Sequence, residues 1–172
     1  MGRKVSRKLL KAIRLLVLDI DGTMTDGRLY YGAQGEQLKA FDVRDGHGLR
    51  LLQAYGGVKL AVLTGRNAEL SAQRCRELSI EIVVGHSRDK GAAIEEIAKT
   101  ARIPLGEAAF MGDDVNDLPA LRKVAFGCAP ADAAAEVLRE VAWVSRRDAG
   151  RGAVRELCEV LLAAKAKWPP AE

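Results

Sequence analysis

A four-residue apolar run that ends in two aspartates is the clearest structural signal in this chain. Residues 15–18 read Leu-Leu-Val-Leu, and Asp19, Asp21 and Gly22 follow directly. Such a run is typical of a strand buried on both faces of a parallel sheet. Open α/β sheets bind ligands at the carboxyl ends of their strands, so both aspartates are predicted to lie where a ligand would bind. The alternative is a strand followed by an ordinary polar turn.

Three more apolar runs end in polar residues in the same way. They are residues 59–63 before Thr64 and Gly65, residues 82–86 before Lys90, and residues 108–111 before the acidic stretch 112–117. Helix-like stretches lie between the runs, at 48–55, 68–78, 90–101, 117–123, 133–141 and 155–167. Strands that alternate with helices predict a doubly wound parallel α/β sheet. An acid pair, a hydroxyl with a glycine, a lysine and an acid cluster, in this order, resemble the four motifs of the haloacid dehalogenase superfamily.

The residue types predict phosphoryl-transfer chemistry. Asp19 would attack phosphorus as a nucleophile, and Asp21 would protonate the leaving oxygen and later activate water. Thr64 and Gly65 would hold the phosphoryl oxygens, and Lys90 would balance their charge. An oxygen-only site suits Mg²⁺, whose predicted ligands are the Asp19 carboxylate, the backbone carbonyl of Asp21 and the Asp113 carboxylate.

Each of these residues also has a purely structural interpretation. Thr64 and Gly65 could form a turn, and Lys90 could be a solvated lysine in the first turn of a helix. Asp113 could cap the helix that follows. We favour the catalytic interpretation because all four motifs occur together.

Composition predicts one soluble domain over residues 1–172. The net charge is +4, and much of the basic excess lies in residues 1–14, which we expect to be a solvated lead-in rather than a nucleic-acid or membrane arm. No stretch approaches the ~20 apolar residues of a membrane span. Three widely spaced cysteines lack metal-site spacing, so a reducing cytoplasm is expected. The tail at 166–172 contains two adjacent prolines and is expected to fray.

A β-hairpin is predicted at residues 28–43, where two strand-like runs flank a glycine-bounded turn. This hairpin occupies the position at which many members of the superfamily insert a cap domain, and no cap domain is predicted here. Its side chains are unusually apolar for an exposed flap, which favours a buried contact between subunits. The alternative is a hairpin that folds back onto its own domain.

Longer strings narrow the resemblance to one family. Residues 19–27, 35–46, 63–66, 112–114 and 150–156 are similar to those of 3-deoxy-D-manno-octulosonate 8-phosphate phosphatases. The resemblance implies a tetrameric Mg²⁺-dependent phosphatase that releases a free sugar acid for lipopolysaccharide assembly. Thr23 and His47 depart from the residues common in this family, so a nine-carbon keto sugar acid 9-phosphate is an alternative substrate.

The resemblance also implies a set of substrate contacts. The set comprises a loop of Asp42, Val43, Arg44, Asp45 and Gly46, three arginines at Arg50, Arg66 and Arg74, and Asn116. Arginine suits a substrate that carries both a phosphate and a carboxylate, because its planar fork of donors matches each group. Arg151, His47 and His86 are not assigned a role.

Three other functions stay open. A phosphate-sensing receiver module also combines acids, a hydroxyl and a lysine, but in another chain order. A catalytically silent regulatory domain would usually have lost the nucleophile or the acid, and both are present here. A phosphatase acting on nucleic-acid ends would make use of the basic lead-in.

Overall fold

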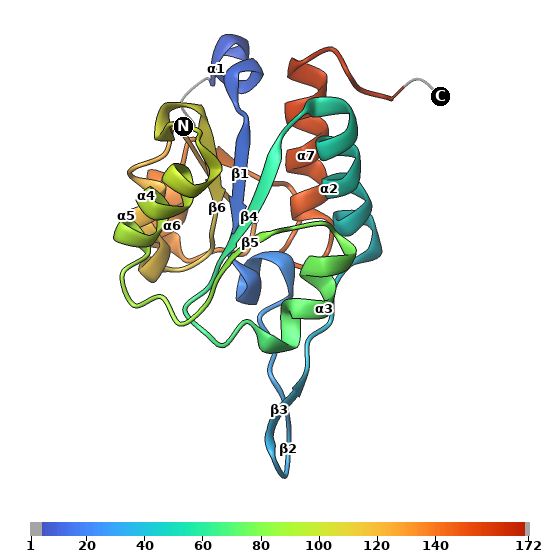
Figure 1. Ribbon diagram of the computed structural model, residues 1–172, viewed down its shortest axis with the longest axis vertical. Coiled ribbons are helices and arrows are strands. Elements are labelled where there is room, and N and C mark those ends of the chain that lie inside the picture. The colour runs from blue at the N-terminus through green and yellow to red at the C-terminus, as the bar shows by residue number, and fades with distance from the viewer. Residues whose placement is uncertain (1–4, 171–172) are drawn as a thin grey trace.

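The strand that precedes Asp19 lies at the centre of a six-stranded parallel sheet (Figure 1). The computed structural model describes residues 5–170. The strands lie in the order β5-β4-β1-β6-β7-β8 and pair in parallel throughout. Their bounds are β1 Leu15–Leu18, β4 Lys59–Leu63, β5 Ile82–Val84, β6 Ala108–Met111, β7 Phe126–Ala129 and β8 Trp143–Val144. The predicted doubly wound sheet is confirmed.

Helices cover both faces of the sheet (Figure 1). One face carries α2 Val43–Gly56, α7 Ala153–Ala164 and α1 Arg7–Ala12, and the other carries α4 Lys90–Ala101, α5 Leu118–Leu121 and α6 Ala135–Glu140. The short helix α3 Glu69–Glu77 follows β4. Side chains of β1 alternate between the two faces, so Leu16 and Leu18 join the α2–α7 cluster while Leu15 and Val17 join the α4 cluster. This double burial explains why the run is apolar at every position.

The predicted hairpin consists of β2 Tyr30–Gly32 and β3 Gly35–Leu38, which pair antiparallel and project from the sheet end where β1 terminates (Figure 1). Both strands are shorter than predicted, because residues 39–42 leave the ladder and lead into α2. The apolar side chains of Tyr31 and Leu38 are 66% and 59% exposed. These two side chains of the hairpin are therefore not covered by their own domain.

The largest correction to the predicted elements concerns α2, which begins at Val43 rather than near residue 48. Asp42 is its N-cap and accepts the backbone N–H groups of Arg44 and Asp45. Two glycines in the first turns suggested a loop. Gly48 is required by packing instead, since a Cβ there would lie 2.9 Å from Cδ of Arg155 in α7.

The two ends of the described chain are also more ordered than predicted. Residues 7–12 of the basic lead-in form α1, and Ser6 caps it by accepting the N–H of Leu9 at 3.2 Å. Trp168 packs against the α2–α7 core cluster, with the Arg155 guanidinium 4.9 Å from its ring centre. Residues 1–4 and 171–172, which belong to the predicted lead-in and tail, lie outside the described residues.

Among the described residues, every helix is too short or too polar to cross a membrane.

Candidate active site

A pocket of about 470 Å³ opens at the carboxyl edge of the sheet. Eight of the residues predicted for the site line it, namely Asp19, Asp21, Thr64, Gly65, Arg66, Lys90, Asp113 and Asn116. Ser87, Arg88 and Asp114 line it as well. The four motifs therefore converge because their strands are neighbours in a parallel sheet and all end at the same edge.

Lys90 connects the nucleophile candidate to the acid cluster. It lies in the first turn of α4, and its Nζ donates to Asp19 Oδ1 at 2.8 Å and to Asp117 Oδ1 at 2.5 Å. All three side chains are buried. Burial alone would lower the pKa of Lys90, but the two carboxylates outweigh it and the pKa lies above its ordinary value. Lys90 is thus a buried ammonium, and its interpretation as a solvated lysine is wrong.

The environment of Asp19 raises its pKa from 3.8 to about 6. Burial is the largest cause, Lys90 opposes it, and Asp117 adds to it. A cation beside Asp19 would favour the ionised carboxylate, which is the form that can act as a nucleophile.

Asp113 lies against the backbone that follows β1. Thr23 donates its hydroxyl to Asp113 Oδ1 at 3.3 Å. Gly22 has φ +88°, and a Cβ there would lie 2.1 Å from Asp113 Oδ2, so only glycine fits. Burial, with Asp19 and Asp117 adding to it, raises the pKa of Asp113 to about 8. Asp113 is half-buried, and the charge of Lys90 only partly offsets these effects on its pKa.

The pocket fits a hard divalent cation. Carboxylate oxygens of Asp19, Asp113 and Asp117 lie within 4.8 Å of one another, and Mg²⁺ prefers such an all-oxygen set. Asp117 is already engaged, because its Oδ2 accepts the N–H groups of Asp113 at 2.9 Å and Asp114 at 3.2 Å while its Oδ1 holds Lys90. Asp19 and Asp113 are therefore the carboxylates available to a cation.

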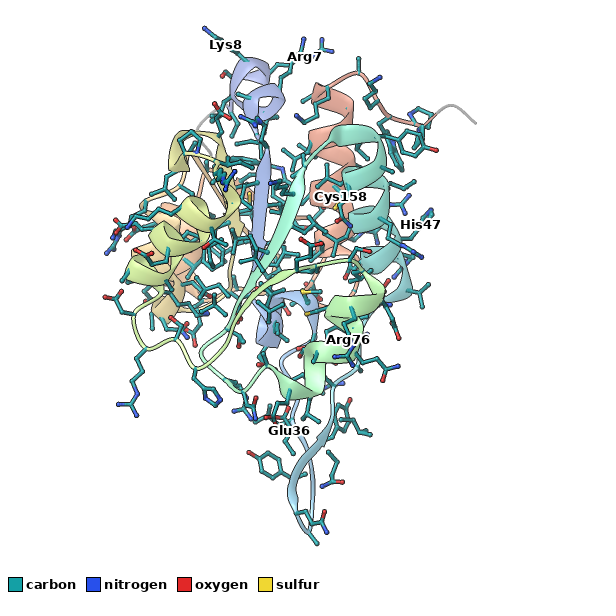
Figure 2. The ribbon with its side chains drawn as sticks, in the orientation of Figure 1. Arg7, Lys8, Glu36, His47, Arg76 and Cys158 are labelled. Atoms are coloured by element: carbon teal, nitrogen blue, oxygen red, sulfur yellow. The ribbon has the colours of Figure 1, made fainter. Side chains whose placement is uncertain are left out.

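Asp21 has partners from the hairpin. The ammonium of Lys39 contacts Asp21 Oδ1 and lies 2.9 Å from Glu36 Oε1. Glu36 also accepts from Arg66 Nη2 at 2.7 Å. Figure 2 shows Glu36 where the hairpin meets the body of the molecule. The hairpin thus contributes charged groups that contact two residues lining the pocket of its own chain, Asp21 and Arg66.

With this geometry established, comparisons with known proteins identify the family. Residues 63–157 match the haloacid dehalogenase-like hydrolase family. The 3-deoxy-D-manno-octulosonate 8-phosphate phosphatase of Yersinia pestis is 42% identical over 155 residues, which cover 90% of this chain and 82% of the relative. The enzyme of the same name from Escherichia coli K12 is 40% identical over 160 residues, covering 93% and 85%. This chain belongs to the 3-deoxy-D-manno-octulosonate 8-phosphate phosphatase family.

Solved structures of the family superpose closely on this chain. The phosphatase of Yersinia pestis gives a TM-score of 0.91 at 40% identity, covering 96% of this chain and 89% of that one. The phosphatase of Moraxella catarrhalis, solved with magnesium, phosphate and the sugar acid, gives 0.90 at 34% identity, covering 94% and 92%. A cobalt-bound relative from Haemophilus influenzae gives 0.89 at 35% identity, covering 92% of each chain.

The remaining substrate contacts implied by the family lie outside the pocket of this chain. Val43, Arg44, Asp45 and Gly46 form the first turn of α2, with Asp42 as its cap, and Arg50 is exposed further along the helix. The Val43 side chain is 80% exposed, and Arg44 pairs with Asp42 at 3.0 Å. Arg74 packs on this turn, since a Cβ at Gly46 would lie 2.0 Å from its Nη2.

His47 and His86 are exposed and do not line the pocket, and Figure 2 shows His47 on the outer side of α2. Arg151 lies 3.6 Å from Asp26.

Asp45 joins α2 to α7. Its carboxylate accepts the N–H of Arg155 at 2.7 Å and that of Gly152 at 3.4 Å, so a residue of one helix caps the N-terminus of the other. Burial raises the pKa of Asp45 to about 6 against these hydrogen bonds, and Asp42 adds to the rise. Asp45 is therefore a structural group in this chain.

Titration of Asp45 should make stability depend on pH. The pKa of Asp45 is 3.8 in the unfolded chain and about 6 in the folded one. In the window between these two pH values the native state therefore binds more protons than the unfolded state. The free energy of unfolding should therefore fall as pH rises through the window, by about 3 kcal/mol at most, and then level off. Asp45→Asn keeps the shorter hydrogen bond through its amide oxygen and should flatten this part of the slope.

Urea denaturation at about pH 4 and about pH 7 checks this expectation. Asp19 and Asp113 titrate in both proteins, so the difference between variant and wild type isolates Asp45. A difference that is the same at both pH values would contradict the assignment.

Several residues of the site are not found by the motifs alone. Asp117 carries a weak signal, since an acid four residues after Asp113 could fold back onto the same loop. Lys39 and Glu36 carry no sequence signal that distinguishes them from ordinary solvated charges on a hairpin. Ser87 and Arg88 precede Lys90 closely and could have been found by proximity to it.

Proposed function

We propose that this protein hydrolyses 3-deoxy-D-manno-octulosonate 8-phosphate to the free sugar acid and phosphate, for lipopolysaccharide assembly, as a Mg²⁺-dependent phosphatase. The observation that carries the proposal is the grouping of Asp19, Lys90 and Asp113 with Thr64 and Gly65 in one pocket. The substrate is supported by the names of the relatives and by the sugar acid held in the Moraxella structure.

The reaction would proceed in two half-reactions. The Asp19 carboxylate forms a bond to phosphorus, the bond from phosphorus to the sugar oxygen breaks, and that oxygen takes a proton from Asp21. Water then attacks the aspartyl-phosphate and gives its proton to Asp21, which releases phosphate and restores Asp19. Asp19 and Asp21 come from one turn after β1, so a single short segment performs both steps.

The other pocket residues would hold the phosphoryl group. The Thr64 hydroxyl and the Gly65 N–H donate to its oxygens, and Lys90 offsets charge on both the phosphoryl group and Asp19. Asn116 borders Gly65, because its Nδ2 lies 3.8 Å from the point that a Cβ on this glycine would occupy. Asn116 can therefore donate to the phosphoryl group as well.

Mg²⁺ would be held by the carboxylates of Asp19 and Asp113 and the backbone carbonyl of Asp21. When bound, it offsets negative charge on the phosphoryl oxygens and on the two carboxylates. The high pKa of Asp113, about 8, supports this assignment because a neighbouring cation would relieve it.

Phosphate release from a panel of substrates with Mg²⁺ tests the proposal. The panel comprises 3-deoxy-D-manno-octulosonate 8-phosphate, a nine-carbon keto sugar acid 9-phosphate, a hexose 6-phosphate and a 3′-phosphorylated oligonucleotide. We expect the first to be hydrolysed fastest and excess EDTA to abolish release. Preference for the nine-carbon substrate would change the pathway and keep the mechanism. Release from none of them by folded protein would favour a silent regulatory domain, and activity that persists in EDTA would exclude the cation.

We further propose that residues 1–172 act as a single domain and assemble as a tetramer through the hairpin. The exposed apolar side chains at its tip and base, Leu29, Tyr30, Tyr31 and Leu38, support a buried contact. Assembly would also bring the exposed Val43 and Arg44 in the first turn of α2, and Arg50 further along the helix, toward the pocket of a neighbour, where the implied substrate contacts could be made.

Light scattering should give the mass of four chains. Tyr31→Asp should shift the protein toward smaller species, because it buries a charge in the contact. A stable, fully active wild-type monomer would contradict the proposal.

The cysteines at 75, 128 and 158 are free and buried, which suits a reducing compartment, and we propose the cytoplasm.

A further inference from the structure

The base of the hairpin packs two charged side chains against residues that line the candidate active site. Lys39 directly follows β3, and its side chain is only 1% exposed. Glu36 lies within β3, and its side chain is 13% exposed. Charged groups buried to this extent are costly unless they are paired.

The pairing is specific and involves Asp21 and Arg66, which both line the pocket. Lys39 contacts Asp21 Oδ1 and Glu36 Oε1, while Glu36 Oε2 accepts from Arg66 Nη2 at 2.7 Å. Arg66 Nε lies 3.7 Å from Asp21 Oδ2, which completes a ring of two cations and two carboxylates. Glu36 therefore anchors both cations that face Asp21.

The two oxygens of Asp21 differ in this ring. Lys39 engages Oδ1, whereas Oδ2 is buried and has no hydrogen-bond partner among the described residues. A carboxyl that an ammonium holds at one oxygen has a fixed orientation, which proton transfer to a bound substrate requires. Without Lys39, the nearest charged group to this carboxyl would be Arg66, beyond hydrogen-bond distance.

We propose that Lys39 and Glu36 are positioning residues, which hold the carboxyl of Asp21 in the orientation from which it exchanges a proton with the leaving oxygen of the substrate and later with the attacking water. This inference rests on the proposed phosphatase reaction. It assigns the hairpin a catalytic duty within its own chain, apart from any contact between subunits.

The leaving group of the substrate distinguishes this role from phosphate binding or from simple support of the hairpin. A sugar alkoxide must be protonated as it leaves, whereas p-nitrophenolate is a stable anion that leaves unprotonated. A residue that acts through Asp21 should therefore matter for the sugar phosphate and little for p-nitrophenyl phosphate. The ratio kcat/KM reports the step in which the leaving group departs.

The test compares wild type with Lys39→Met, which removes the ammonium and keeps a long side chain. We expect kcat/KM for the sugar phosphate to fall ~10–100-fold and that for p-nitrophenyl phosphate to fall less than ~3-fold. Glu36→Gln should produce a smaller loss of the same pattern and serves if Lys39→Met does not fold. Lys99→Met is the matched control, because Lys99 is an exposed lysine that also pairs with a glutamate.

An equal loss on both substrates, or no loss on either, would overturn the inference. Hydrolysis of both substrates by the wild type establishes the phosphatase independently of the variants. A wild type that hydrolyses neither would instead defeat the proposed function, and this inference with it.

Discussion

Asp19→Asn should abolish turnover while leaving the fold intact. An amide oxygen is a poor nucleophile, so phosphate release should fall by ~10⁴-fold or more. Stability should be maintained for two reasons. The substitution removes a negative charge whose burial raises the pKa of Asp19 to about 6. It also keeps a side-chain oxygen that Lys90 can contact.

Steady-state phosphate release and urea denaturation, measured on the same preparation, check both parts of this prediction. Asp148→Asn is the matched control, since Asp148 is exposed and lies outside the pocket. A folded Asp19→Asn protein that retained most of its activity would contradict the covalent mechanism.

Lys90→Met should have the largest effect on stability. Lys90 is the ammonium within hydrogen-bond distance of Asp19 and Asp117, and removing it leaves buried carboxylates facing one another. Breaking a buried charge pair from one side typically costs about 3–5 kcal/mol, and we expect a loss of this size at pH 8 without Mg²⁺. The loss should be smaller at pH 5, because the carboxyls can then take up protons. Phosphate release should fall as well.

Urea denaturation at both pH values measures the effect. Asp117→Asn added to Lys90→Met should recover part of the loss, since it removes one of the two stranded charges. Lys99→Met should change the free energy of unfolding by less than ~0.5 kcal/mol, because its ion pair is exposed. A Lys90→Met protein as stable as wild type at pH 8 would contradict the arrangement of charges described above.

The sheet and the edge that carries the pocket could be predicted because their signals are local. Each strand is a short apolar run, and each motif follows its strand within a few residues. The parallel order then brings Asp19, Thr64 and Asp113 together without further information. Helix α4 was predicted with its observed bounds because its apolar residues recur at helical spacing, and the structure adds that Asp89 caps its start.

The remainder depends on contacts between distant segments. The start of α2 is stabilised by packing on α7, so its two glycines are misleading when considered alone. Lys39 contacts Asp21 across the base of the hairpin, and spacing along the chain does not encode that contact. Arg44 and Arg50 were implied by family resemblance, and one chain does not bring them to its own pocket.

The packing of α7 on α2 has a consequence for how the chain folds during synthesis. The face of the sheet that carries α4, α5 and α6 can be covered by segments made before residue 141. The opposite face cannot be covered until Val154, Leu157 and Leu161 of α7 are made, and these are synthesised long after β1 and α2. Until then the apolar sides of β1 and α2 stay open to solvent, and such surfaces favour aggregation and chaperone binding. The nascent protein can therefore bury one face of its sheet before α7 is synthesised, and it buries the other only after α7 has emerged.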